Sequence, residues 1–284
     1  LPLLFCTIVA EMNDDSKNSA GFFKTQPISM QSLLPGISNF DFSPVEKCSF
    51  SDEQLEIPER LMLGKRAECY FSEWVTRSAN YELVAQNVQI IDKKQTLGEF
   101  DFLLRRKTDN QLIHVELVYK YYLFDPEVKG LEVEKWIGPN RGDQLDFKLD
   151  KLKNHQFPLL KTAPAIHRIK ELGVDVTKVE QQVVFLANLF VPLNQTVSFQ
   201  EVNQGGVEGS WMRMNDWEEQ FNADDHFFIP EKKNWFLREL SNVCWLSRAE
   251  AYESIREHHN RKRSPLVYSK GADEVQRRDF VVWW

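Results

Sequence analysis

The sequence predicts an α/β protein with a central sheet of mixed strand direction. One helical pattern precedes three strand patterns, and a second helical stretch precedes a further buried strand. This alternation is typical of helices that pack on a sheet. At 284 residues the chain is long enough to bury a substantial core, in one large domain or two small ones.

The first helix is expected within residues 58–78 and the first strand at 81–92. The apolar stripe of that helix consists of Ala67, Phe71, Trp74 and Val75. Glu68 follows Ala67 directly and is i,i+3 with Phe71. It is therefore expected at or inside the stripe rather than on the solvent face.

Residues 98–124, GEFDFLLRRKTDNQLIHVELVYKYYLF, form the pattern of two apolar strands around a polar turn. A helix is expected from Asp143 to Phe157. A second helix is expected near 164–172, followed by a buried strand at 179–193. The leucine stripe of the first of these helices consists of Leu145, Leu149 and Leu152.

The pattern changes on both sides of this region. Residues 11–56 are rich in Ser, Asn, Asp and Pro, and we expect an irregular arm with at most short helices. Late in the chain, short aromatic strands such as HFFIP and FVVWW alternate with a helix that opens at Ser247, with Glu250 in capping-box spacing. Many of the eight Trp residues lie in this half, which is therefore expected to have its own packed core.

Composition and charge limit the class of protein. The formal net charge of −7 argues against an abundant protein that coats DNA, although a local basic groove is compatible with it. The four cysteines show no C-x-x-C spacing, so no zinc knuckle or redox pair is expected, and scattered thiols fit a reducing cytoplasm. The apolar run LPLLFCTIVA is too short to span a bilayer and lacks a basic leader. Neither a membrane segment nor a signal peptide is expected.

Two carboxylates lie in the middle of the hairpin strands, where side chains alternate between faces. A two-residue turn at 108–109 places Asp101 opposite Glu116. A turn at 109–110 makes the two residues diagonal neighbours. Both registers put the pair on one face, within about 5–8 Å of each other. A three-residue loop would put them on opposite faces.

Opposed carboxylates repel, and a divalent cation relieves the repulsion because hard oxygen ligands suit Mg²⁺. Lys120 shares the face of Glu116, where it can hold a nucleophilic water or a developing negative charge. The alternative is a solvated face on which Asp101 pairs with a Lys or Arg side chain.

Four motifs in order resemble the PD-(D/E)XK nuclease superfamily, whose restriction-endonuclease-like core runs helix, three strands, helix, strand. These motifs are GKRAE (64–68), QNVQI (86–90), GEFDF (98–102) and HVELVYK (114–120). The set GEFDFLL, HVELVYKYYLF and WIGPNRGDQLDFKLDKLKNHQ looks more closely like a bacterial domain-of-unknown-function family grouped with that superfamily. The closer resemblance extends from about residue 58 to the C-terminus, whereas the superfamily core covers about 60–195.

The resemblance implies roles by position. Glu68 matches the helical acid, Asp101 the metal-binding aspartate and Glu116 the second metal ligand. In the superfamily the lysine usually stands two residues after the glutamate, where this chain has Val118, and Lys120 keeps the face further along the strand. The parts implied are an N-terminal arm at 1–56, a PD-(D/E)XK-like core at 57–195 and a C-terminal α+β portion at 196–284 packed on the core.

Beside the leucine stripe lies a second stripe of Gln144, Lys148, Lys151 and His155. It is either a rim that follows phosphates or a solvated face with Asp–Lys pairs, and its first two members are the ones expected to reach the site. His114 shares the face of Glu116 and either joins the site or is structural. REHHNRKR (256–263) either touches nucleic acid or complements a helix C-terminus.

The leading hypothesis is a Mg²⁺-dependent nuclease, with Mn²⁺ as an alternative ion, that hydrolyses DNA phosphodiester bonds in the cytoplasm. Asp101 and Glu116 are expected to bind the metal, and Glu68 to act as an auxiliary ligand or to orient water. Lys120 is expected to stabilise negative charge. The residues expected to bind substrate are Gln144, Lys148 and Lys151. The rival hypothesis is a catalytically inactive nucleic-acid-binding or assembly module on the same scaffold; RNA as a substrate and the oligomeric state are left open.

Overall fold

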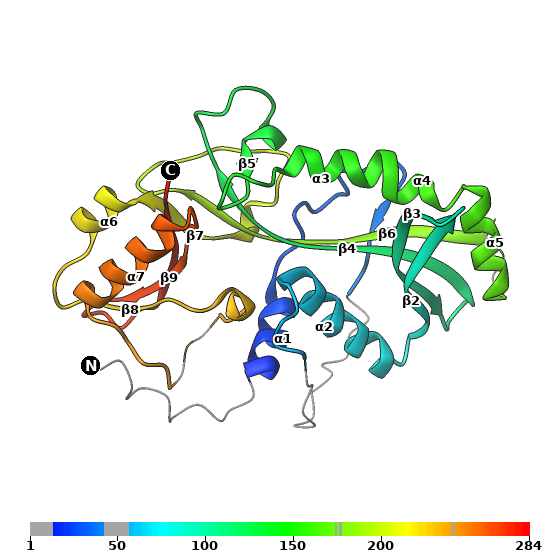
Figure 1. The fold of residues 1–284 in the computed structure, drawn as a ribbon, viewed down its shortest axis with the longest axis horizontal. Coiled ribbons are helices and arrows are strands. Elements are labelled where there is room, and N and C mark those ends of the chain that lie inside the picture. Colours follow the sequence, from blue (N-terminus) through cyan, green and yellow to red (C-terminus); the bar gives the residue numbers. More distant parts are fainter. Residues whose placement is uncertain (1–13, 43–56, 174, 176–177, 239, 241) are drawn as a thin grey trace.

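The computed structural model describes the chain except for residues 1–13, 43–56, 174, 176–177, 239 and 241. A long twisted sheet runs through the molecule, and helices cover both of its faces (Figure 1). The principal strands are ordered β2-β3-β4-β6-β7-β10-β9-β8, while β1 pairs with β6 and β5 with β4.

The helices and strands are α1 (Asp14–Lys24), β1 (Ser38–Asn39), α2 (Leu63–Arg77), β2 (Tyr81–Asp92), β3 (Gln95–Arg106), β4 (Gln111–Phe124), β5 (Trp136–Ile137), α3 (Leu145–Lys151), α4 (Phe157–Leu159), α5 (Ala163–Glu171), β6 (Val179–Pro192), β7 (Val207–Arg213), α6 (Met214–Gln220), β8 (His226–Phe228), α7 (Arg248–Asn260), β9 (Leu266–Lys270) and β10 (Arg277–Val282). A π-helical turn joins α3 to α4 at Leu152–Gln156, and short 3₁₀ turns include Lys232–Asn234.

The predicted α/β class with a large mixed sheet is confirmed. The predicted strand at 81–92 coincides with β2, and the buried strand at 179–193 is β6 within one residue. The four apolar residues predicted to form the stripe of the first helix are all buried in α2. The helix predicted near 164–172 is α5. In this part of the chain the hydrophobic pattern alone therefore located the elements.

The β3–β4 hairpin adopts one of the two predicted registers. Phe102 pairs with Val115 and Arg106 with Gln111, which is the register expected for a turn centred on 108–109. Strand β4 then pairs in parallel with β6 from Leu112 to Leu123. Strand β4 consequently lies inside the sheet, with α3 and α4 over one face and α1 and α2 over the other (Figure 1).

The helix predicted from Asp143 to Phe157 begins at Leu145 and contains an irregular turn. Its leucines at 145 and 152 are buried as predicted. From Leu152 to Gln156 the backbone forms a π-helical turn before α4 continues the helix. A π turn places one extra residue in the helix, so the face presented to the sheet shifts by one position after it.

The N-terminal arm is more regular than the sequence predicts. It contains the 11-residue helix α1, and Phe22 of this helix is completely buried. Further along, the amide nitrogens of Ile28 and Phe40 donate to carbonyl groups of β6. Aromatic side chains scattered in a polar segment thus pack on the sheet, a tertiary effect that local composition does not reveal.

The C-terminal half extends the same sheet. Strand β7 pairs in parallel with β6, and β10 pairs in parallel with β7. A separate apolar cluster around Trp217 and Phe227 confirms the expected local core, whereas Trp211 and Trp235 join the main cluster. The predicted capping box at the start of α7 is present. Within the described residues, no helix is both long and apolar enough to cross a membrane.

Gly209→Ala is expected to destabilise the fold where β7 and β10 meet. A Cβ atom at this position would overlap the carbonyl oxygen of Arg278, which belongs to the neighbouring strand and cannot move independently. Overpacking of this kind costs about 1–3 kcal/mol, measurable by urea unfolding. The matched control is Gly64→Ala in α2, where a Cβ atom meets nothing within 4 Å, and we expect unchanged or slightly higher stability. Equal effects of the two substitutions would contradict this account.

Candidate active site

The two carboxylates of the hairpin lie where strand β3 separates from β4. The last backbone pair of this ladder is Phe102 with Val115, and the same register would place Asp101 opposite Glu116. Beyond that pair, the Asp101 carboxylate itself accepts a hydrogen bond from the Leu117 amide, at 2.9 Å. The Asp101 carboxylate oxygen thus takes the place of a backbone acceptor of β3. Strands β3 and β4 are no longer paired at the two acids.

The other neighbour of Asp101 is also irregular. In β2, Gln86 pairs with Phe102 and Val88 with Phe100, so Asn87 falls opposite Asp101. Asn87 has a φ of 52°, a left-handed conformation that is uncommon inside a strand. Residues in sparsely populated backbone conformations gather at active sites and ligand-binding sites, where the surrounding structure holds them in place.

Glu116 is completely buried and held by neutral side chains. Its Oε1 lies 2.9 Å from Nε2 of His114, and its Oε2 accepts a hydrogen bond from the Gln156 amide. Nδ1 of His114 lies 3.2 Å from the Gln181 amide nitrogen, which can only donate. His114 therefore carries its proton on Nε2 and donates a hydrogen bond from this nitrogen to Glu116.

His114 serves as a fixed, uncharged donor. Its ring is fully buried between Phe100 and Phe157. Burial lowers the pKa of His114 to about 4, so the ring is neutral near pH 7. Gln181, which sets the tautomer of His114, is itself fixed by a 2.9 Å bond to the Phe157 carbonyl. The sequence left open whether His114 joins the site or is structural. In the structure it is hydrogen-bonded to Glu116, the predicted metal-binding glutamate.

Glu68 of α2 lies close enough to the pair to interact with it. Its side chain is 13% exposed, in agreement with its predicted position at the apolar stripe. Lys65 bridges Glu68 at 2.7 Å and Glu99 at 3.1 Å. Burial raises the pKa of Glu68 to about 7, and the charge of Asp101 contributes to the rise.

All three acids have raised pKa values. For Asp101 the pKa rises to about 7, first through burial and then through the charge of Glu116. For Glu116 burial raises the pKa to about 8, against the opposing charge of Lys148. Burial is the main cause of all three shifts, and neighbouring carboxylates add to the shifts of Glu68 and Asp101.

Lys148 acts on Asp101 and Glu116 from α3, in addition to Lys65, which acts on Glu68 and Asp101. Its Nζ donates to Oε1 of Gln156 at 2.9 Å, and the amide of the same Gln156 donates to Glu116. Burial lowers the pKa of Lys148, while the charges of Glu116 and Asp101 oppose the shift. We call Glu68, Asp101, Glu116 and Lys148 together the carboxylate site.

The other predicted residues lie around this group. Lys120 forms a 2.5 Å ion pair with Asp143, and each of these side chains is 36% exposed. The Gln144 amide donates to the Glu134 carbonyl in the loop before α3, so it is engaged outside the carboxylate site. Lys151 is exposed, and its charge acts on Glu116 from a distance.

The donor set fits a divalent cation held by two carboxylates. Mg²⁺ is usually bound by one or two protein carboxylates, and its other positions hold water and phosphate. Asp101 and Glu116 supply such a pair, at the point where the strands separate. Across the described residues, no three His, Cys, Asp or Glu side chains form a metal-binding group.

Sequence reasoning missed Gln156 and Gln181, which fix Glu116 directly and through His114. The predicted stripe continued from Lys148 to His155 at regular helical spacing, but His155 is exposed. The π-helical turn shifts the inward face by one residue, so that Gln156 takes the inward position. Gln181 comes from β6, and no local pattern connects it to the hairpin.

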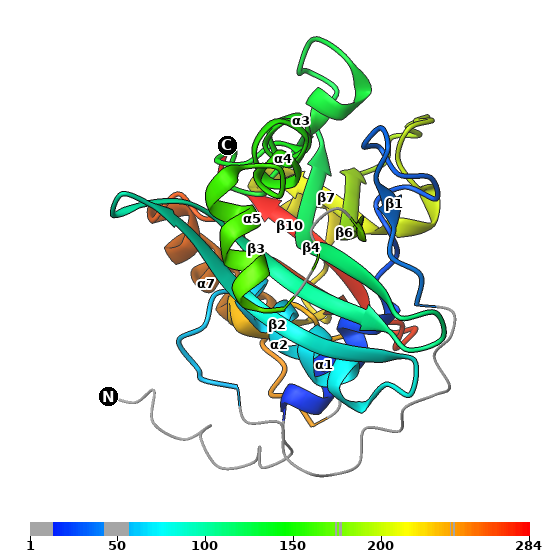
Figure 2. The same cartoon turned by 90° about the vertical axis from the view of Figure 1, so that its right-hand side faces the viewer.

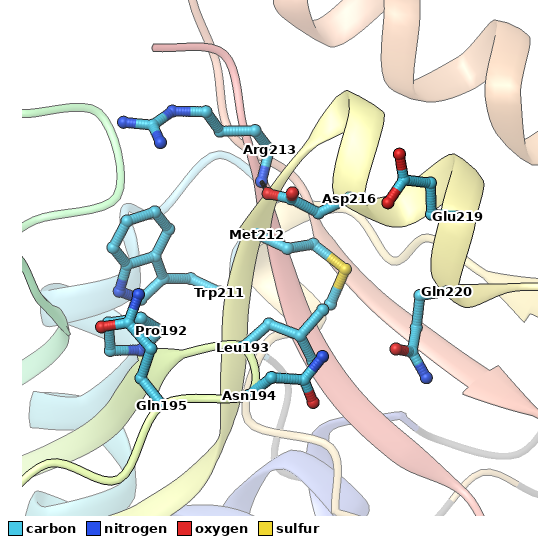
Figure 3. Close-up of a pocket in the computed structure, with 10 residues that line it drawn as sticks. All are labelled: Pro192, Leu193, Asn194, Gln195, Trp211, Met212, Arg213, Asp216, Glu219 and Gln220. Atoms are coloured by element: carbon cyan, nitrogen blue, oxygen red, sulfur yellow. Dashed lines mark hydrogen bonds between the residues drawn. The ribbon is translucent and has the colours of Figure 1, made fainter.

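A separate pocket lies at the other end of β6 (Figure 3). It is lined by Trp211, Met212 and residues at the end of β6, with Asp216 and Glu219 of α6 at its rim. The Asp216 carboxylate accepts a hydrogen bond from the Arg213 amide, at 3.0 Å. No residue of the carboxylate site lines this pocket, and Asp216 caps the start of α6.

A family model described as "Domain of unknown function (DUF1853)" matches residues 42–282. The match includes both the carboxylate site and the C-terminal strands of the sheet. No curated protein and no solved structure matches the chain.

Asp101→Asn is expected to alter the pH dependence of stability. Because folding raises the pKa of Asp101 from 3.8 to about 7, the favourable contribution of its protonated form is complete below pH 3.8 and is lost as the pH rises through 7. Asparagine keeps an oxygen for the Leu117 amide and carries no charge. In EDTA the variant should be more stable than the wild type at pH 8.5, by about 1–2 kcal/mol, and the difference should shrink by pH 6.

The control for this experiment is Asp109→Asn in the exposed hairpin turn. Arg106 lowers the pKa of Asp109, so this group stays ionised from pH 6 to 8.5, and its substitution should change stability equally throughout. Urea unfolding at several pH values measures both variants. A constant difference for Asp101→Asn would show that its carboxyl group does not titrate in this range.

Proposed function

The chain belongs to the DUF1853 family, and we propose that it is a divalent-metal-dependent nuclease that hydrolyses DNA phosphodiester bonds. The observation that carries the proposal is the meeting of Asp101 and Glu116 where β3 leaves β4, with Glu68 and Lys148 beside them. Buried acids with raised pKa values and a partly buried lysine, grouped where a sheet opens, suit phosphoryl chemistry better than they suit a purely structural role.

A restriction-endonuclease-like core is part of the proposal. Its support is the element order α2, β2, β3, β4, helix, β6, together with an antiparallel β2-β3-β4 meander whose last strand pairs in parallel with β6. The positions that matched the superfamily motifs supply the acids from the expected elements, namely α2, β3 and β4.

In this mechanism the side chains of the protein would position the metal ion and polarise the reacting groups. A bound Mg²⁺ or Mn²⁺ would supply positive charge to the phosphate and to the attacking water. Asp101 and Glu116 would hold the ion, and His114 and Gln156 would fix the Glu116 carboxylate in one orientation. Glu68 would accept a hydrogen bond from the attacking water. The water oxygen bonds to phosphorus as the bond from phosphorus to the leaving oxygen breaks; the proton of the attacking water passes to Glu68, and the leaving oxygen takes a proton from bulk water.

Lys148 is the better candidate than Lys120 for stabilising the developing charge. The superfamily's usual lysine position is occupied by Val118, which is buried and apolar. Lys148 reaches the acids from α3 and is already linked to Glu116 through Gln156. Lys120, by contrast, is paired with Asp143. A cation approaching from the helix would serve the same electrostatic purpose as one on the strand.

The second candidate is an inactive DNA-binding module that retains the scaffold. The observation that favours it is the same Val118, because no lysine stands beside Glu116 on the strand itself. A cytoplasmic location belongs to the proposal as well; its support is the scattered spacing of the four cysteines, which show no C-x-x-C pair.

The proposed roles predict different kinetic effects for the two lysines. With Mg²⁺ or Mn²⁺ and a plasmid substrate, Asp101→Asn and Glu116→Gln should abolish cleavage. Lys148→Met should lower kcat about 10²-fold, as expected for loss of one charge-stabilising group. Lys120→Met should act mainly on KM. Initial rates at several substrate concentrations distinguish the two effects.

The control for the lysine variants is Lys153→Met, an exposed lysine on the same helical segment. It should leave both constants unchanged. If Lys148→Met behaved like Lys153→Met while cleavage remained dependent on Asp101, the role assigned to Lys148 would be wrong. No cleavage of plasmid or branched DNA by the wild type, with unaltered DNA binding by the acid variants, would select the inactive module.

Metal binding can be tested without any substrate. Mg²⁺ or Mn²⁺ should raise the unfolding temperature of the wild type, since a ligand at about 100 times its dissociation constant adds about 2.7 kcal/mol to stability. The gain should vanish in an Asp101→Asn/Glu116→Gln double variant and persist in Asp109→Asn. Thermal unfolding monitored by circular dichroism measures it. An equal gain in the double variant would place the ion elsewhere.

A further inference from the structure

We propose that five cationic side chains form a DNA-backbone-binding track that leads from the carboxylate site to the C-terminal half. The basic track consists of Lys151, Lys148, Lys120, Lys232 and Arg263. The proposal rests on the proposed DNA-directed function and extends it, because it assigns the C-terminal half of the chain a part in holding the substrate strand.

Each member of the basic track lies close enough to the next for their charges to interact. The charges of Lys151 and Lys120 both lower the pKa of Lys148. Burial, followed by the charges of Lys120 and Arg263, lowers the pKa of Lys232. These side chains therefore form a continuous series, and they come from α3, β4, the 3₁₀ turn at Lys232–Asn234 and the segment after α7.

Packing on β4 holds the C-terminal members in place. The Tyr121 hydroxyl donates to the Trp235 carbonyl at 2.6 Å, which fixes the turn carrying Lys232 beside the strand of Lys120. The Nζ of Lys232 lies 5.3 Å from the centre of the Trp235 ring. On the side of β4 that faces β3, the described ladder pairs stop at Val115 and resume with β5 at Leu123. The charge of Lys120 acts on Lys232 near that open edge.

Arg263 is fixed by its neighbour in sequence. The Ser264 amide donates to the Asn140 side chain at 2.8 Å, and the Ser264 hydroxyl donates to the Pro139 carbonyl. The indole of Trp284 donates to the same Pro139 carbonyl at 3.0 Å. The loop that leads to Asp143 and the segment that carries Arg263 are therefore joined.

Nearby acids balance part of the charge of the basic track, and Glu116 and Asp101 act on Lys148. Asp143 is hydrogen-bonded to Lys120, and it is the carboxylate whose charge acts on Lys232. The whole chain nevertheless carries a net charge of −7. A series of repelling cations, fixed by hydrogen bonds on an acidic protein, is stabilised when phosphates neutralise it.

The length of the basic track suits a nucleic acid strand rather than a small anion. Glu116 and Lys120 are four residues apart in β4, which corresponds to about 13 Å at about 3.3 Å per residue. Along a duplex axis that distance spans about four phosphates of one strand. A strand with one phosphate at the carboxylate site would thus present a later phosphate to Lys120, Lys232 and Arg263.

The test is DNA binding by the 284-residue chain in EDTA, where no cleavage occurs. The double variant Lys232→Ala/Arg263→Ala should bind a fluorescent 20-base-pair duplex more weakly. Because each lost phosphate contact reduces the slope of log K against log salt by about 0.9, the magnitude of the slope should fall by about 1.8. Fluorescence anisotropy at four salt concentrations measures it, and circular dichroism confirms that the variant is folded.

The matched control is Lys233→Ala/Arg261→Ala. It also removes one lysine and one arginine, at positions one residue from Lys232 and two residues from Arg263. Lys233 pairs with Glu231 at 3.3 Å and with Glu59 at 3.6 Å, and Arg261 is exposed. This variant should keep the wild-type slope. An equal fall in slope for the two double variants, or no fall for Lys232→Ala/Arg263→Ala, would overturn the basic track. A wild type that binds DNA with the predicted slope but never cleaves it would overturn only the nuclease assignment.

Discussion

One buried carboxylate constrains much of this molecule. A glutamate with no solvent contact is costly unless its oxygens are hydrogen-bonded, and Glu116 is in that position. Its partners come from separate elements: His114 from its own strand and Gln156 from the π-helical turn, with Gln181 of β6 behind the histidine. The hydrogen bonds to this single side chain fix the helix over β4 relative to the sheet. It also fixes the position of Lys148, because Gln156 connects the two charges.

The regular part of the structure could be predicted from the sequence because it depends on short periods. Alternation along the hairpin placed Asp101 and Glu116 on one face, and the predicted registers included the one observed. Helical spacing located α2 and placed Glu68 beside its apolar stripe. These predictions held because side-chain direction follows from local backbone geometry.

The remaining contacts depend on features that have no local signature. The π-helical turn replaces His155 by Gln156 at the inward face, and nothing in LKNHQ marks the extra residue. Lys120 was expected to assist the acids, but Asp143 arrives from a loop and pairs with it. Its role in charge stabilisation stays a prediction without a structural test. The burial of α1 against the sheet and the approach of Lys232 to β4 are likewise tertiary events, in which a distant segment decides the environment.

Strand β6 connects the part of the sheet that carries the acids with the C-terminal half of the chain. It pairs with β4 from Val179 to Phe190 along one edge and with β7 from Leu189 to Pro192 along the other, so continuous strand pairing runs from the acids into the C-terminal half. Two lobes joined by a flexible linker could adjust their separation to each ligand, but lobes that share a sheet cannot hinge without breaking strand pairs. The sheet therefore fixes the distance between the acids and the distal cations of the proposed basic track. Discrimination among substrates would come from whether a strand of the right length and curvature lies along a rigid surface, not from closure of the protein around it.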